Sequence, residues 1–123
     1  MSCLFNSLSH FLNIPSQTIR QTICEYLASN KPLFEDLDTR VVLGLDMLPE
    51  NYVLKMRNQS TWGGAIEINA ACNIWNLNIT VCNIRDRNST KIIFQPIIVH
   101  DIPLRKIVLE WSGNHFSPVR QNV

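Results

Sequence analysis

Two side chains of this sequence are suited to act as a nucleophile and its base: Cys3, near the start, and His115, near the end. Cys3 lies at the start of a predicted helix, where unpaired backbone N–H groups and the positive end of the helix dipole favour a negative charge. Such a place, together with a neighbouring imidazolium, favours the reactive thiolate form of a cysteine. His115 follows the turn residues Ser112-Gly113-Asn114 and precedes Phe116, so we expect it to open a strand near the surface. Because a nucleophile and its base meet in space, their separation in sequence is no obstacle.

The alternative interpretation of Cys3 is a buried structural thiol, since free cysteine is among the most buried residue types. The other cysteines lie within apolar helix or strand patterns, and we expect them to be structural: Cys24, Cys72 and Cys82. No two cysteines form a CxxC pair, which argues against a zinc site and a dense disulfide framework. Reduced thiols in the cytoplasm fit this pattern, and we expect no metal and no cofactor. His10, in mid-helix, and His100, in a loop, are not favoured as the base.

Helices are predicted to lead and strands to follow. Apolar residues at helical spacing predict a buried first helix from Cys3 to about Asn13 and a second, with Ser16 as its N-cap, that stops near Asn30. Residues 33–48 are ambiguous between a helix and a packed loop. Pro49 suits the first turn of a helix through Met56, and a further helix is predicted over 64–74.

The second part of the chain contains short β-branched or aromatic runs between turn-forming residues, which predict strands over 78–84, 91–97, 105–111 and 115–119. This order indicates an α+β fold, in which a small, mostly antiparallel sheet is covered by the N-terminal helices. With 123 residues, 46% of them apolar, we expect a single domain over 1–123.

Composition excludes several classes of function. The formal net charge is +1 and neither sign clusters, so no nucleic-acid footprint is indicated. No apolar run reaches the roughly 18 residues that a membrane-spanning helix needs, and no basic-then-apolar leader opens the sequence. We therefore expect a soluble, unexported protein.

Three separated segments resemble the ovarian-tumour (OTU) class of cysteine proteases, in the order in which that family has them. The segment Cys3-Leu4-Phe5, with Ser7-Leu8, resembles the nucleophile motif. The segment from Trp62 to Glu67 resembles the WGG-x-x-E helix start, and Asn114-His115-Phe116 resembles the terminal His-Tyr/Phe motif. The resemblance runs from Cys3 to Val119, almost the whole chain, and implies a papain-type α+β fold.

The resemblance also implies an activity: hydrolysis of the isopeptide or peptide bond that follows the Gly-Gly end of ubiquitin or a ubiquitin-like protein. His115 would accept the Cys3 proton, and the thiolate would attack the carbonyl to form an acyl-enzyme that water releases. Backbone N–H groups of Ser2, Cys3 and Leu4 would stabilise the oxyanion.

The resemblance gives roles to the residues of the central motif as well. Gly63 and Gly64 would let the thin substrate tail pass close to the backbone, and Trp62 would line one side of the channel that holds the tail. The alternative is that the two glycines only permit a tight start of the helix, without substrate contact.

Two positions depart from the family pattern. The aspartate that the family often places three residues before the cysteine is absent, because only Met1 and Ser2 precede Cys3. Either the chain begins inside a longer protein, or the oxyanion site is built from Ser2, Cys3 and Leu4 alone. The second departure is Ser117 in place of an acidic or amide residue. Its hydroxyl can orient the imidazole but carries no charge, so we expect a Cys-His dyad or a weak triad.

Asn114 is a poorer candidate for orienting His115, because adjacent residues on a strand point to opposite faces. We place it on the substrate side of the site, where its side chain would help to hold the oxyanion. The abridged nucleophile segment and the missing acidic residue resemble OTU domains of plus-strand RNA virus polyproteins. On that interpretation the protein acts in the host cytoplasm and the same site would also cut its own polyprotein.

Two other interpretations stay open. The chain could be a catalytically weak or inactive ubiquitin-binding module with an OTU fold, in which Cys3 is unreactive. It could also be an interaction domain unrelated to ubiquitin, which would make the order of the three motifs a coincidence.

Overall fold

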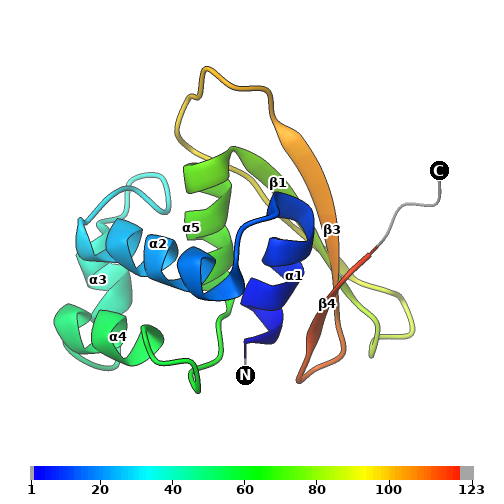
Figure 1. The fold of residues 1–123 in the computed structure, drawn as a ribbon, viewed down its shortest axis with the longest axis horizontal. Coiled ribbons are helices and arrows are strands. Elements are labelled where there is room, and N and C mark those ends of the chain that lie inside the picture. The colour runs from blue at the N-terminus through cyan, green and yellow to red at the C-terminus, as the bar shows by residue number, and fades with distance from the viewer. Residues whose placement is uncertain (1, 120–123) are drawn as a thin grey trace.

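A computed structural model describes residues 2–119. Its helices are α1 (Cys3–Leu12), α2 (Ser16–Ala28), α3 (Thr39–Leu43), α4 (Pro49–Met56) and α5 (Ala65–Trp75), and its strands are β1 (Leu77–Asn83), β2 (Lys91–Phe94), β3 (Arg105–Trp111) and β4 (Phe116–Pro118). The expected order of helices followed by strands is confirmed, and the fold is α+β (Figure 1). None of the described helices combines the length and the apolar character that crossing a bilayer requires.

The strands form one sheet in the order β2-β1-β3-β4. β1 pairs antiparallel with β2, and β3 pairs antiparallel with β4, so the sheet is mostly antiparallel as expected. Its central pair, β1 with β3, is parallel, with Ile79 opposite Ile107. The parallel pairing requires a crossover along the sheet, which β2 and the loop over 95–104 supply. β4 therefore lies at one edge of the sheet, next to β3.

The helices form two groups relative to the sheet (Figure 1). α1 packs against β4, and α5 packs against β1 and β2, so these two helices lie between the sheet and the rest. α2 contacts α1, α5 and α4, and α3 contacts α4. Within residues 2–119, the main helix contacts with the sheet come from α1 and α5 and not from all of the leading helices.

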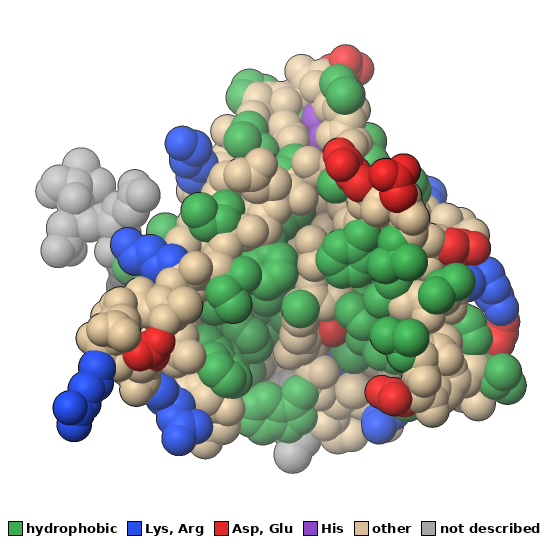
Figure 2. Space-filling view, turned by 180° about the vertical axis from the view of Figure 1, so that it is seen from behind, with side chains coloured by type: hydrophobic (Ala, Val, Ile, Leu, Met, Phe, Trp, Pro, Cys, Tyr) green, Lys and Arg blue, Asp and Glu red, His purple; other side chains and the backbone are tan. Residues whose placement is uncertain are grey.

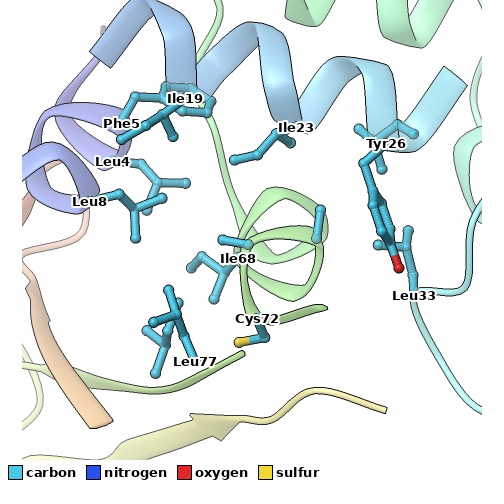
Figure 3. Close-up of a cluster of buried hydrophobic side chains, with 14 of the residues drawn as sticks. Leu4, Phe5, Leu8, Ile19, Ile23, Tyr26, Leu33, Ile68, Cys72 and Leu77 are labelled. Atoms are coloured by element: carbon cyan, nitrogen blue, oxygen red, sulfur yellow. The ribbon is translucent and has the colours of Figure 1, made fainter. Parts of the chain in front are cut away.

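The core lies where α1, α2 and α5 meet above the sheet. Figure 3 shows apolar side chains from these helices and from the start of β1 pointing toward one another: Leu4, Phe5, Leu8, Ile19, Ile23, Ile68 and Leu77. Each is almost fully buried, and burying one such side chain stabilises a fold by about 1.5–3 kcal/mol. The packing of these α1 side chains in the core sets the position of the helix, and therefore also the position of Cys3 at its N-terminus.

Local sequence explains most element boundaries. α1 ends at Leu12 and is followed by Asn13, which adopts the left-handed conformation that asparagine tolerates, and α4 begins at Pro49. Two expectations were wrong. The N-cap of α2 is Pro15, and the hydroxyl of Ser16 donates to Asn6 Oδ1, 2.6 Å away, instead of capping the helix.

The second correction is that β2 ends at Phe94 rather than at residue 97. Pro96 has no N–H to give to a sheet, and the N–H groups of Ile97 and Ile98 bond to Oδ1 of Asn73, at 2.8 and 3.3 Å. The ambiguous segment 33–48 contains one short helix, α3, which Asp38 caps by accepting a hydrogen bond from the backbone N–H of Arg40.

Candidate active site

Cys3 is the first residue of α1 and is buried, with 8% of its surface exposed. The backbone N–H of Phe116, in the first position of β4, points at Cys3 Sγ from 3.5 Å. The Cys3 carbonyl is also held, by a 2.8 Å hydrogen bond from the hydroxyl of Ser7. The two ends of the described chain therefore meet at the sulfur, because α1 packs against β4.

His115 immediately precedes the residue that contacts the sulfur. A turn leads into it from β3: Gly113 has φ 101°, a conformation that glycine adopts without strain, and the N–H of Ser112 bonds to the His115 carbonyl at 3.0 Å. The side chain is exposed. Within residues 2–119, no hydrogen bond joins the imidazole to Cys3 Sγ. The structure thus brings the His115 segment to Cys3, and His115 itself is exposed.

Ser117 and Asn114 lie on either side of His115. Ser117 is half-buried in β4, opposite Glu110 of β3, whereas His115 precedes the strand, which begins at Phe116 and not at His115 as expected. Asn114 is exposed, and its Oδ1 accepts a hydrogen bond from Ser112, at 3.2 Å. In the described part of the chain neither residue hydrogen-bonds to the imidazole.

The central motif lies beside the nucleophile helix. A Cβ added to Gly63 would lie 2.8 Å from Cδ2 of Leu4 and 3.0 Å from the ring of Phe5, so only glycine lets this backbone approach α1 so closely. A Cβ added to Gly64 would meet nothing within 4 Å. Trp62 is 49% exposed. The two glycines therefore differ: the first packs against α1 and the second borders open space.

An apolar hollow of about 160 Å³ lies against Ala65, the residue that follows Gly64. It is lined by Ala65 and Ile68 of α5, Val81 of β1, Ile92 and Phe94 of β2, and Trp111 and Phe116 next to the His115 turn. Figure 2 shows hydrophobic side chains gathered on one face of the molecule, with more polar and charged groups toward its periphery. Apolar surface is thus available close to both Gly64 and the Cys3–Phe116 contact.

Glu67 anchors the start of α5 from inside the protein. It is 1% exposed, accepts the N–H of Gly64 at 2.8 Å, and accepts the hydroxyl of Tyr52 at 2.7 Å. Burial raises the pKa of the Glu67 carboxyl, although both hydrogen bonds and the charge of Arg20 oppose the rise. Burial and the nearby carboxylate also raise the pKa of Tyr52. Sequence reasoning gave no role to Tyr52; the only available signal was Glu67 at the third position of a helix, where a capping residue is expected.

The two other buried cysteines do not resemble Cys3. Burial raises the pKa of Cys24 to about 11 and that of Cys72 to about 12, so both thiols stay protonated near neutral pH. Cys82 is half-buried in β1. The prediction that Cys24 and Cys72 are structural is consistent with this burial, and all four thiols are free.

A family model for the OTU-like cysteine protease matches residues 2–115, a span that includes both Cys3 and His115. The ubiquitin thioesterase otu2 of Schizosaccharomyces pombe is 32% identical over 88 residues, which are 67% of this chain and 29% of that protein. The chain thus spans about three tenths of the length of this curated relative.

Solved structures show the same fold. The OTU domain of OTUD1 superposes with a TM-score of 0.73 and 17% identity, covering 98% of this chain and 79% of that one. An ovarian-tumour domain solved in complex with ubiquitin gives a TM-score of 0.73 and 21% identity, covering 95% of this chain and 62% of that one. Since the family model covers nearly all of the described residues, and the three motifs lie together around Cys3, the chain belongs to the family of OTU-like cysteine proteases.

Proposed function

We propose that this chain is a thiol-dependent deubiquitinase, in which Cys3 is the nucleophile and His115 its base. The observation that carries the proposal is the contact between the Phe116 N–H and Cys3 Sγ, at 3.5 Å. This contact joins the first residue of the nucleophile motif to the residue that follows His115, which supports the pairing of the two as nucleophile and base. The likeness to a ubiquitin thioesterase and to an OTU domain solved with ubiquitin supports ubiquitin or a ubiquitin-like protein as the substrate.

In the proposed reaction, the imidazole of His115 removes the Cys3 proton and the thiolate attacks the carbonyl carbon of the scissile bond. The C–N bond breaks, His115 returns the proton to the leaving amine, and water then hydrolyses the thioester. The exposed side chain of His115 would have to turn toward the sulfur, which the residue that follows it already contacts. Ser117, two residues further along the chain, is the proposed orienting group.

The oxyanion would be held by backbone N–H groups at the start of α1, around Ser2, Cys3 and Leu4. Each such donor is typically worth about 3 kcal/mol of transition-state stabilisation. Asn114, beside the base, is the side chain proposed to assist from the substrate side.

The substrate tail is proposed to pass over Gly64, where the structure leaves open space, with the exposed Trp62 as a wall. The apolar hollow next to Ala65 offers a surface against which an extended tail would pack. Gly63 serves a different purpose, because its lack of a side chain is needed for contact with Leu4 and Phe5. We place the reaction in the cytoplasm, where free thiols such as these persist.

The deciding experiment incubates the protein with ubiquitin that carries an electrophile at its C-terminus and measures the intact mass. We expect a one-to-one adduct that maps to Cys3, which is absent in Cys3→Ala and strongly slowed in His115→Ala. Both variants should keep the circular dichroism spectrum of the wild type and its melting temperature to within a few degrees, because Cys3→Ala removes a single buried atom and His115 is exposed.

The other outcomes distinguish the alternatives. Tight ubiquitin binding without an adduct, unchanged by Cys3→Ala, would identify an inactive binding module. Neither binding nor an adduct from folded protein would reject ubiquitin as the substrate, and a peptide spanning a junction of the protein's own precursor would be tested next. An adduct on Cys82 would reject Cys3 as the nucleophile.

A further inference from the structure

Arg20 is a fully buried arginine that links three parts of the fold. It lies in α2 and has 0% of its surface exposed. Its Nη1 donates to the Met56 carbonyl at 2.8 Å, and its Nη2 donates to the Gln59 carbonyl at 3.4 Å and to the hydroxyl of Ser2 at 3.3 Å. The guanidinium also stacks over the ring of Phe5, 4.1 Å from its centroid. It therefore joins the end of α4 and the segment after it to the first turn of the nucleophile helix.

A charge buried at this depth is expensive unless hydrogen bonds compensate it, so the geometry around the guanidinium is strongly determined. Burial lowers the pKa of Arg20, and the nearby Cys24 and Glu67 oppose the change. The planar guanidinium presents several donors in fixed directions, which a lysine cannot reproduce. A lysine at this position would satisfy some of the carbonyls and leave the others without their donor.

Ser2 occupies the N-cap of α1 and yet does not cap it. Serine at this position usually accepts a hydrogen bond from an N–H of the first turn. Here the side chain makes no such bond, and its oxygen accepts from Arg20 instead. The backbone carbonyl of Ser2 still begins the helix, by accepting the N–H of Asn6 at 2.7 Å. The hydroxyl is thus held by Arg20 and not by the N–H groups that follow Cys3.

We infer that Arg20 is a positioning residue for catalysis, which holds the Ser2 hydroxyl away from the first turn of α1 and so leaves those backbone N–H groups open to the oxyanion. The inference rests on the proposed function, because the oxyanion belongs to the Cys3 reaction. Ser2 has φ −104° and ψ 22°, outside the extended conformation that a capping serine usually adopts. Without the arginine, Ser2 can relax to that extended conformation, in which its hydroxyl caps the same N–H groups. The oxyanion would then have to displace a hydrogen bond that is already made.

A double-mutant cycle tests whether Arg20 acts through Ser2. The substrate is ubiquitin with a fluorogenic C-terminal amide, and kcat and KM are measured separately. We expect Arg20→Lys to lower kcat by about tenfold or more with little change in KM, in line with the loss of an oxyanion donor. We expect Ser2→Ala to change kcat by less than about threefold, and Arg20→Lys to have little further effect in the Ser2→Ala background.

The control variant is Arg57→Gln. Arg57 follows α4 and bonds to Glu25 and Gln21 of α2, so it joins the same two helices as Arg20 without reaching the nucleophile. Its loss should leave kcat unchanged. If Arg20→Lys lowers kcat equally in the presence and absence of the Ser2 hydroxyl, Arg20 has a purely structural role and the inference is wrong.

A second readout does not depend on activity. Amide hydrogen exchange of Leu4 and Phe5, followed by NMR, should slow severalfold in Arg20→Lys and should not slow when Ser2→Ala is also present. Faster exchange at both amides would mean that the helix start frays, which overturns the inference. If the wild type shows no reaction with ubiquitin while the exchange pattern is as expected, the proposed function fails. The inference that Arg20 keeps the Ser2 hydroxyl from capping α1 would still stand.

Discussion

Gly63 and Leu4 are in contact at a distance that admits no side chain on the glycine. A Cβ at position 63 would lie 2.8 Å from Leu4 Cδ2, with the Phe5 ring 3.0 Å away. We predict that Gly63→Ala lowers the free energy of unfolding by about 1–3 kcal/mol, because both neighbours are buried and cannot move aside freely. Urea unfolding followed by circular dichroism measures this change. A loss below about 0.5 kcal/mol would mean that α1 shifts easily, contrary to the packing described.

Gly64→Ser is the contrasting variant. The added side chain enters open space, and serine is favoured at the N-cap position that Gly64 occupies, so the free energy of unfolding should change by less than about 1 kcal/mol. If the substrate tail passes over this residue, KM for a ubiquitin amide should rise by about tenfold with a smaller change in kcat. An unchanged KM would favour the alternative in which Gly64 only starts the helix.

Ser117→Ala tests the third position of the site. The hydroxyl can orient the imidazole but adds no charge to stabilise its protonated form. We predict a loss of about tenfold in kcat/KM, equivalent to about 1.4 kcal/mol of barrier. Steady-state kinetics beside His115→Ala provide the comparison. A loss as large as that of His115→Ala would make Ser117 a full member of a triad.

Glu67 should give the stability of this protein a distinct pH dependence. Because burial raises the pKa of its carboxyl in the folded state, folding favours the neutral form. The stabilisation is fully present below the ordinary pKa of 4.5 and is lost as the pH rises through the raised value. The unfolding free energy of the wild type, relative to that of Glu67→Gln, should therefore fall as the pH increases above about 4.5.

The measurement is urea unfolding of both proteins over a series of pH values. Glutamine keeps an acceptor for the Gly64 N–H, and the Tyr52 hydroxyl can rotate to accept from its amide, so the variant should fold. Taking the difference between the two proteins cancels the titration of the groups that they share. A difference that does not depend on pH, or that rises with pH, would show that the carboxylate is stabilised by its hydrogen bonds more than burial opposes it.

Much of the fold could be predicted because each element buries one periodic face. The spacing of apolar residues after Cys3 placed α1 within one residue, and Pro49 marked the start of α4. Pairs of β-branched residues located β1 and β3. These signals are local, because the spacing of apolar residues within a short segment indicates whether that segment buries one face of a helix or of a strand.

The errors came from side chains that act across the fold. β2 is shorter than predicted because Asn73, in α5, takes the N–H groups of Ile97 and Ile98. The hydroxyl of Ser16 bonds to Asn6 and does not cap its own helix. Periodicity and capping preferences could not indicate either partner, although Pro96, which cannot donate to a sheet, was a local signal that β2 ends before residue 97.

The sequence alone determined the order of helices and strands, the position of Cys3 at a helix start and the three motifs that mark the family. Only the tertiary structure decided that β1 and β3 pair in parallel, that the Phe116 N–H meets Cys3 Sγ, and that Arg20 reaches Ser2. The physical reason is the distance along the chain over which each kind of interaction acts. Periodicity and capping are properties of a few neighbouring residues, whereas these contacts join segments whose relative positions depend on the packing of the whole core.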